Sequence, residues 1–208
     1  MKNMIKNLVV AAALLISGTT FAAIEIGKDY KLLNPPQPAS TMKIEVLEFF
    51  FYGCSHCFDL HKPLSVWQKT MPKDAELVYV PTIFRDSWEP MARTFYALES
   101  LDQLYPLHDA LYKAWNVDNE VLSDEAKILN FVAPRGVDRA KFSAAYNSFS
   151  MQSKVVRAKQ MIRSYGIAGT PTLVVNGKYL ITGLQPADTI RVLNEVIEMA
   201  RKERSAKR

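Results

Sequence analysis

The chain has only two cysteines, Cys54 and Cys57, and two residues separate them. A cysteine thiolate is both a nucleophile and a leaving group, so a close pair can cycle between dithiol and disulfide. A structural disulfide stabilises most when it closes a long loop, and this loop would be very short. The spacing therefore predicts a redox-active pair, with Cys54 as the attacking thiol and Cys57 as the resolving thiol.

The residues around the pair predict how it is positioned. Residues 43–52 form a nearly continuous apolar run, which indicates a central strand buried on both faces. Gly53 ends the run, and apolar residues from Cys54 onward recur at helical spacing. At the start of a helix, free N–H groups and the helix dipole favour a thiolate, so we expect a lowered pKa for Cys54. Cys57 should lie one turn further along and be buried.

Two further residues could tune this site. His56, between the cysteines with Ser55, could add a donor or a positive charge near the thiolate, although a simply solvated histidine is the alternative. Glu48 interrupts the apolar strand, on the face shared by Val46 and Phe50. Burial there would raise the pKa of Glu48 and make it a candidate proton shuttle near Cys57. The alternative is an edge-strand glutamate that reaches water.

The rest of the chain predicts an α/β protein with a helical insertion. A second strand over 76–81 completes a strand–helix–strand unit, and helical spacing then runs through 89–101, 104–115, 123–132, 138–149 and 151–165. Thr170-Pro171 precedes a short strand over 172–175, the turn Asn176-Gly177 and a return strand over 178–182. A closing helix is expected over 185–202, followed by a frayed tail.

The first 22 residues have the pattern of a cleavable export signal. Lys2 and Lys6 precede an apolar run over 8–16, and small residues follow up to Ala22 and Ala23. The run is much shorter than the ~20 residues of a membrane helix, which disfavours an uncleaved anchor. We therefore expect four parts: a signal peptide over 1–22, a first fold half over 23–84, a helical insertion over 85–148 and a second half over 149–208.

Composition excludes several classes of protein. Hydrophobic residues make up 49% of the chain and charged residues 23%, which is typical of a globular protein and not of a disordered one. The formal net charge of +5 is mild, and no long basic run interleaves with aromatic residues. We therefore expect no nucleic-acid partner.

The ordered set of motifs resembles the DsbA family of bacterial periplasmic disulfide-bond oxidases. The matching segments are Val46-Leu47-Glu48-Phe49-Phe50, Cys54-Ser55-His56-Cys57, Tyr146-Asn147-Ser148-Phe149, Gly169-Thr170-Pro171-Thr172 and Val175-Asn176-Gly177-Lys178-Tyr179. The resemblance implies a thioredoxin-like fold with an inserted α-helical domain, and a periplasmic oxidase that donates its Cys54–Cys57 disulfide to newly exported proteins. Ser55 departs from the Pro-His middle pair that is common in the family, which leaves the reduction potential open.

The resemblance also implies the other members of the site and the partners. It places Thr170-Pro171 beside the cysteines, with a cis bond before Pro171 and the Thr170 backbone free to pair with an extended substrate. An ordinary trans turn proline is the alternative. The partners would be unfolded or partly folded exported proteins and a membrane quinone-linked protein, DsbB-like, that re-oxidises the pair. We expect a monomer with no cofactor and no metal.

Two other functions compete with this interpretation. A disulfide isomerase or reductase could share the fold, but dimeric isomerases carry an extra N-terminal domain for which residues 24–42 are too short. A metal-binding module could use Cys54 and Cys57 with His56 or His61, yet a structural zinc site needs four ligands and the chain has no second cysteine pair. For His61 and His108, packing or surface roles are favoured.

Overall fold

The computed structural model describes residues 24–39 and 41–206. The predicted signal peptide, residues 1–22, lies outside the described residues. None of the helices in the described ranges combines the length and the apolar character needed to cross a membrane.

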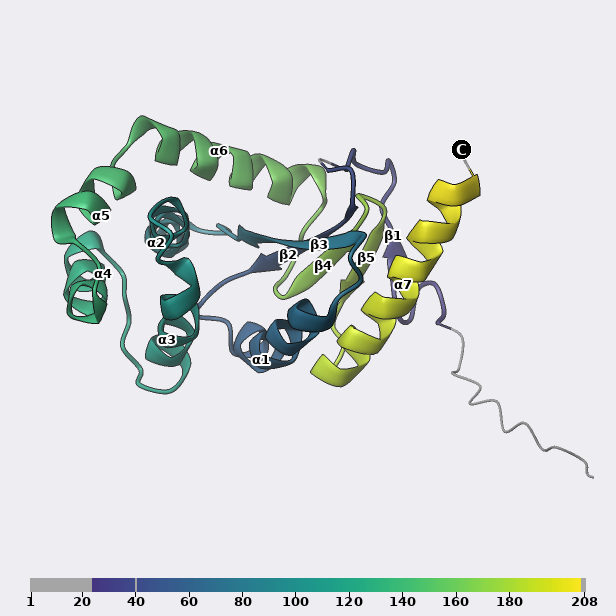
Figure 1. The fold of residues 1–208 in the computed structure, drawn as a ribbon, viewed down its shortest axis with the longest axis horizontal. Coiled ribbons are helices and arrows are strands. Elements are labelled where there is room, and N and C mark those ends of the chain that lie inside the picture. Colours follow the sequence, from purple (N-terminus) through teal and green to yellow (C-terminus); the bar gives the residue numbers. More distant parts are fainter. Residues whose placement is uncertain (1–23, 40, 207–208) are drawn as a thin grey trace, which may run out of the picture.

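A five-stranded mixed sheet forms the centre of the fold (Figure 1). Its strands, in the spatial order β1-β5-β4-β2-β3, are β1 (Lys31–Leu32), β5 (Tyr179–Thr182), β4 (Thr172–Val175), β2 (Ile44–Phe50) and β3 (Ala75–Pro81). Only β2 and β3 run parallel, and the other neighbours are antiparallel. Every residue of β2 is buried, as its nearly continuous apolar run predicted.

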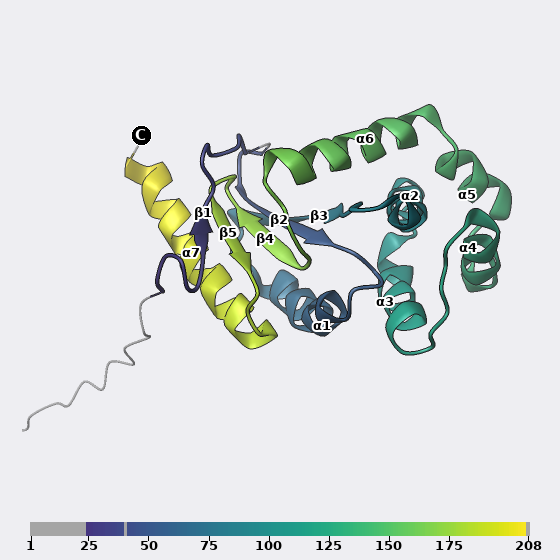
Figure 2. The same cartoon turned by 180° about the vertical axis from the view of Figure 1, so that it is seen from behind.

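Helices cover both faces of the sheet, and this arrangement makes three layers. Figures 1 and 2 show α1 (Ser55–Thr70) and α7 (Pro186–Ala206) on one face, with α6 (Phe149–Ser164) on the other. The first face buries Leu60 and Leu64 of α1 with Val192 of α7. The fold is the predicted thioredoxin-like one.

The remaining helices gather beyond one end of the sheet (Figure 1). They are η1 (Asp86–Trp88), α2 (Glu89–Ser100), α3 (Leu104–Asn116), α4 (Glu125–Val132), η2 (Ala133–Arg135) and α5 (Arg139–Tyr146). Their apolar side chains form one cluster that also contains Phe50 of β2 and Cys57 of α1. The helical insertion therefore packs directly against the end of the sheet that carries the cysteines, while its bounds at 85 and 148 stay a prediction.

Two expected helix ends differ most from those observed. The helix expected over 138–149 ends at Tyr146, and α6 begins afresh at Phe149 because the Ser148 hydroxyl accepts the N–H of Met151 at 3.1 Å and caps the new helix. The tail expected to fray from residue 202 continues α7 to Ala206. Long-range bonds hold it there, since Arg204 donates to the Met42 carbonyl at 2.8 Å.

The hairpin between β4 and β5 has the predicted tight turn. Asn176 and Gly177 have φ values of 52° and 65°, the left-handed conformation that this residue pair adopts readily. Glycine is required at the second position for another reason as well, because a Cβ there would lie 1.9 Å from the backbone oxygen of Gln37. The turn sets the register of β4 against β5, and the pairing of Thr172 with Phe49 brings Thr170 and Pro171, just before β4, to the end of β2.

Candidate redox site

Cys54 caps the N-terminus of α1. Its backbone is extended, with φ −95° and ψ 116°, and the helix begins at Ser55. Gly53 makes the turn from β2 possible, because a Cβ at this position would lie 2.5 Å from the Phe51 ring and 2.8 Å from the Trp115 ring. The tight turn therefore leaves Cys54 with its sulfur beside the free N–H groups of the first helical turn, as the sequence predicted.

This position favours the thiolate of Cys54. The hydrogen bond from the Cys57 thiol has the largest effect on the pKa of Cys54; together with Thr170 and the backbone N–H groups of His56 and Cys57, and against the opposing effect of partial burial, it lowers this pKa to about 5. Cys54 is the N-cap residue of α1, so its sulfur lies near the N–H groups of the first helical turn, where the helix dipole favours negative charge. At neutral pH the reduced protein therefore carries its negative charge on Cys54.

Cys57 has the opposite character. It is fully buried inside the helical cluster, and burial raises its pKa far above the usual range, with the hydrogen bond to Cys54 adding to the effect. Both cysteines are free thiols in this structure. The pair is thus asymmetric: one sulfur is partly accessible and ionised, and the other is buried and protonated.

Thr170 and Pro171 complete the site from the other half of the chain. The peptide bond between them is cis, as expected. The Cys54 sulfur lies 3.3 Å from the Thr170 carbonyl oxygen, across 116 residues of sequence, and donates to it when the thiol is protonated. The two segments that the family resemblance placed together are therefore in direct contact.

Glu48 lies behind the cysteines, on the middle of β2. Its neighbours in the sheet are Tyr79 of β3 and Leu173 of β4, and only 1% of its surface is exposed. Burial raises its pKa to about 8, and among the described residues its Oε1 has no hydrogen-bond partner. The expected burial is confirmed, and the carboxyl is protonated at neutral pH.

The raised pKa of Glu48 makes stability depend on pH in a defined direction. Between about pH 4.3, where an unfolded glutamate ionises, and pH 8, only the folded state holds the proton. The free energy of unfolding therefore falls as pH rises through this window, by at most ~1.4 kcal/mol per unit. Glu48→Gln should be more stable than the parent at pH 8, by on the order of 2–4 kcal/mol, and about equal to it at pH 4.

Denaturant unfolding at both pH values checks this, with Glu120→Gln as the exposed control. A stability difference between Glu48→Gln and the parent that does not change with pH would mean that Glu48 ionises normally in the folded protein.

The remaining predicted site residues are not enclosed. Ser55 and His56 are exposed on the first turn of α1. Within the described part of the chain, the His56 side chain makes no hydrogen bond or ion pair, so its influence on Cys54 as a charge or donor stays a prediction.

The sequence singled out neither of two buried histidines as a functional group. His61 and His108 are 9% and 6% exposed, and their rings meet edge to face at 4.9 Å. Nδ1 of His108 also forms a hydrogen bond with the hydroxyl of Tyr52 at 2.7 Å, and Tyr52 is two residues before Cys54 in the sequence. The helical spacing of His108 and Tyr112 along α3 could have indicated that His108 faces the core. The rings that pack against His108 come from Phe50 of β2 and His61 of α1, and no local sequence pattern predicts these contacts.

Metal ligands do not converge in the described residues. Nowhere in 24–39 and 41–206 do three or more His, Cys, Asp or Glu side chains stand close enough to hold an ion. Cys54, Cys57 and the histidines of α1 therefore do not form a coordination site in this arrangement.

Comparisons with known proteins agree with this geometry. Residues 45–193 match the family described as the DSBA-like thioredoxin domain. The thiol:disulfide interchange protein DsbA of Pseudomonas aeruginosa is 33% identical over 97% of this chain and 98% of its own length. The protein of the same name from Bordetella parapertussis is 36% identical over 92% and 95% of the two chains.

Solved structures give the same result for the fold. The crystal structure of Pseudomonas aeruginosa DsbA superposes with a TM-score of 0.83 at 33% identity, covering 89% of this chain and 97% of that one. The oxidoreductase DsbA from Xylella fastidiosa superposes with a TM-score of 0.81 at 29% identity, covering 86% and 98%.

Proposed function

Because the chain belongs to the family of DSBA-like thioredoxin domains and is a thiol:disulfide oxidoreductase, we propose that it works in the oxidising direction, as a donor of disulfides to exported proteins in the periplasm. The asymmetry of the two sulfurs carries the proposal. A thiolate held by helix N–H groups and by the Cys57 thiol stabilises the dithiol form, and the disulfide form has no such charge to stabilise. The protein therefore gives its disulfide away.

The transfer takes two steps. In the first, a substrate thiolate attacks Cys54 of the disulfide, the Cys54–Cys57 bond breaks, and Cys57 leaves with the electron pair and takes up a proton. In the second, another thiolate of the same substrate attacks the mixed disulfide and releases Cys54 as a thiolate. The substrate loses two electrons and the cysteine pair gains them, so the redox-active disulfide needs no cofactor or metal.

Glu48 is the proposed source of the proton for Cys57. It is close enough for its charge to act on the pKa of Cys57, and its own pKa of about 8 keeps it protonated before transfer. A carboxyl with a pKa near the working pH can give and take a proton readily. By donating a proton to Cys57 as it leaves, Glu48 would prevent the formation of a buried, unprotonated Cys57 thiolate.

The substrate would bind beside Cys54 in a groove of about 190 Å³. The groove runs between the start of α1 and the β4–β5 hairpin, and its walls include His56, Thr170, Pro171, Ile181 and Leu184. Pro171 offers no N–H that could compete for the sulfurs, and the Thr170 backbone can pair with an extended peptide. Walls that combine apolar side chains with backbone and hydroxyl groups suit extended segments of unfolded or partly folded chains of varied sequence.

Location and turnover complete the proposal. The N-terminal pattern over residues 1–22 supports Sec-type export and cleavage, and the mature protein would work as a monomer in the bacterial periplasm. There a membrane quinone-linked, DsbB-like protein would re-oxidise Cys54 and Cys57 after each transfer.

A single-turnover assay tests the direction of transfer. Oxidised protein lacking residues 1–22 is mixed with an equimolar unfolded peptide that contains two thiols, and both products are separated by mass. We expect one disulfide to appear in the peptide for each Cys54–Cys57 pair reduced. A peptide that remains reduced, while the same protein readily reduces a disulfide-bonded peptide, would assign the protein as a reductase.

A further inference from the structure

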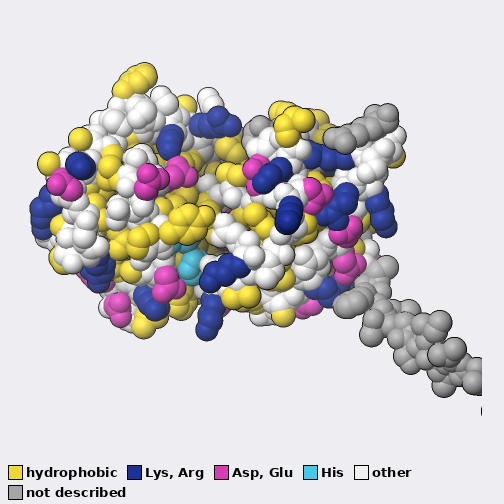
Figure 3. All heavy atoms as spheres, viewed as in Figure 1, with side chains coloured by type: hydrophobic (Ala, Val, Ile, Leu, Met, Phe, Trp, Pro, Cys, Tyr) yellow, Lys and Arg dark blue, Asp and Glu magenta, His cyan; other side chains and the backbone are white. Residues whose placement is uncertain are grey.

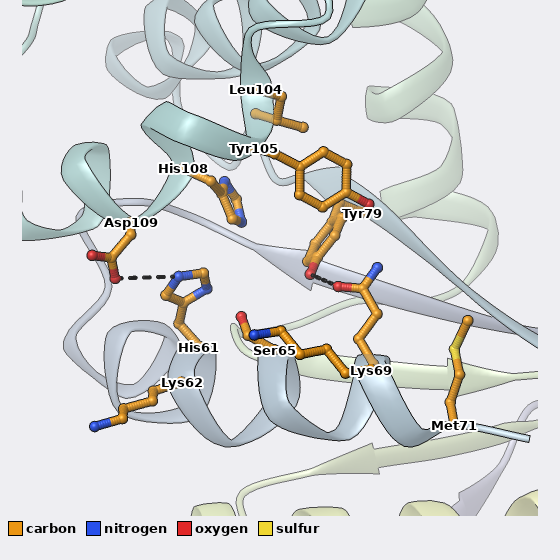
Figure 4. A pocket seen from close by; sticks show the side chains of 11 residues that line it. His61, Lys62, Ser65, Lys69, Met71, Tyr79, Leu104, Tyr105, His108 and Asp109 are labelled. Atoms are coloured by element: carbon orange, nitrogen blue, oxygen red, sulfur yellow. Dashed lines mark hydrogen bonds and ion pairs between the residues drawn. The ribbon is translucent and has the colours of Figure 1, made fainter. Parts of the chain in front are cut away.

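A second hollow lies on the side of α1 away from the substrate groove. It is a cavity of about 560 Å³ between α1, α3 and the edge strand β3, and Figure 4 shows it from close by. Its lining includes His61, Ser65 and Lys69 of α1, Tyr79 of β3, and Tyr105 and His108 of α3. It shares none of them with the groove beside Cys54.

A buried hydrogen-bond donor without a partner lies at the bottom of this cavity. His108 is 6% exposed, and no described residue bonds to its Nε2. Burial lowers the pKa of His108 to about 3, so the ring is neutral. With the Tyr52 hydroxyl donating to Nδ1 of His108, its one partner within the described residues, the ring proton lies on Nε2; the other tautomer would leave both the Tyr52 proton and Nε2 unpaired. Figure 4 shows the ring directed into the space between His61 and Tyr79.

Charge in the cavity favours an anion. In Figure 4 the Lys69 side chain runs along α1 toward Ser65, beneath the gap between His61 and Tyr79. In the described part of the chain, its ammonium group has no acidic partner. The one acid in the lining, Asp109, already pairs with Lys113 at 3.0 Å and lies 3.6 Å from His61. The cavity thus holds free donors and a free cation, whereas its carboxylate is occupied.

The walls favour an apolar body on the same ligand. Tyr79, Leu104, Tyr105 and Met71 contribute apolar surface, and the Tyr105 ring is 79% exposed at the mouth. Figure 3 shows hydrophobic side chains with nearby cationic ones around a histidine on this face. The volume lies within the ~300–1,000 Å³ of typical small-molecule sites.

We propose that this cavity binds a small amphipathic carboxylate, with its apolar body between Tyr79 and Tyr105 and its carboxylate bound by Lys69, Ser65 and Nε2 of His108. The His61 ring shields that nitrogen from solvent, and among the described residues a single polar contact, to Asp109 at 3.6 Å, holds the ring. The ring turns aside when the carboxylate enters, and the unpaired N–H gains an acceptor. Binding here is independent of the direction in which Cys54 and Cys57 transfer electrons.

The test uses ¹⁵N-labelled protein without residues 1–22 and three matched probes: 4-phenylbutyrate, its neutral amide and 4-phenylbutylamine. We expect the carboxylate to bind with a Kd on the order of 1 mM, with shifts at Ser65, Tyr105 and the His108 Nε2–H signal. The amide and the amine should bind roughly ten-fold more weakly. Lys69→Gln should weaken carboxylate binding roughly five-fold.

Lys73→Gln is the matched control, because it removes the same charge from an exposed lysine just beyond the end of α1 that does not line the cavity. It should change the Kd by less than two-fold. Equal binding of all three probes, equal effects of the two lysine variants, or shifts confined to the groove beside Pro171 would each overturn the proposal.

Discussion

Cys57→Ala is expected to convert a transient mixed disulfide into a stable adduct, whereas Cys54→Ala should reduce the rate of substrate oxidation to that of the buffer alone. The physical reason is the difference in access. Cys54 is partly exposed at the helix start and ionises with a pKa of about 5, while Cys57 is fully buried and stays protonated. Only Cys54 can meet a substrate sulfur, and only Cys57 can release it internally.

Non-reducing gels of protein isolated from the bacterial envelope would show the adducts. Cys57→Ala should give higher-mass bands that disappear with dithiothreitol, and Cys54→Ala and the double variant should give none. Adducts that form equally well through Cys57 in Cys54→Ala would contradict the assigned roles.

The second large effect is an inverted stability of the two redox forms: reduced protein should unfold at a higher temperature than oxidised protein. In the reduced form the pKa of Cys54 falls from its ordinary value of about 8.5 to about 5 on folding. A group with a lowered pKa stabilises the folded state fully above its unfolded pKa, and this stabilisation disappears as pH falls through the folded pKa. The disulfide form has no thiolate and gains nothing.

At pH 7 the solution is two pH units above the pKa of Cys54 in the folded protein. The thiolate can therefore add at most ~2.7 kcal/mol to the free energy of unfolding of the reduced form. Cys54 is only about half buried, so solvent screening reduces this to on the order of 1–2 kcal/mol, or several degrees in Tm. The difference in Tm should grow between pH 5 and pH 8.5. Below pH 5 the advantage of the reduced form should vanish.

Calorimetry of both forms across this range measures the effect, and equilibration with glutathione buffers measures it independently. A pair that stays reduced until the buffer is strongly oxidising agrees with it. An oxidised protein that melts above the reduced one at pH 7, and a pair already oxidised in a strongly reducing buffer, would remove the basis for the oxidising direction.

Local sequence patterns were sufficient to predict much of the fold. The apolar run in β2, the break at Gly53 and the helical spacing after Cys54 are each visible within a short stretch of sequence, and each was confirmed. The Asn176-Gly177 turn was equally local. The predicted helix ends at residues 149 and 202 were wrong, because a serine cap and long-range bonds to Met42 and Asp74 decide the observed limits.

The sequence by itself determined the chemistry: two cysteines at the start of a helix, an acid inside a buried strand, and a Thr-Pro pair ahead of a hairpin. Tertiary structure alone decided the distances that make these groups act together. The sheet order places β4 beside β2, and this brings Thr170 to Cys54 across 116 residues and closes Glu48 inside the core. It also assembles Tyr52, His61, Lys69 and His108 around a cavity. Short-range propensities fix where a helix or strand begins, but the burial that shifts a pKa or leaves an N–H unpaired comes from elements far apart in the chain.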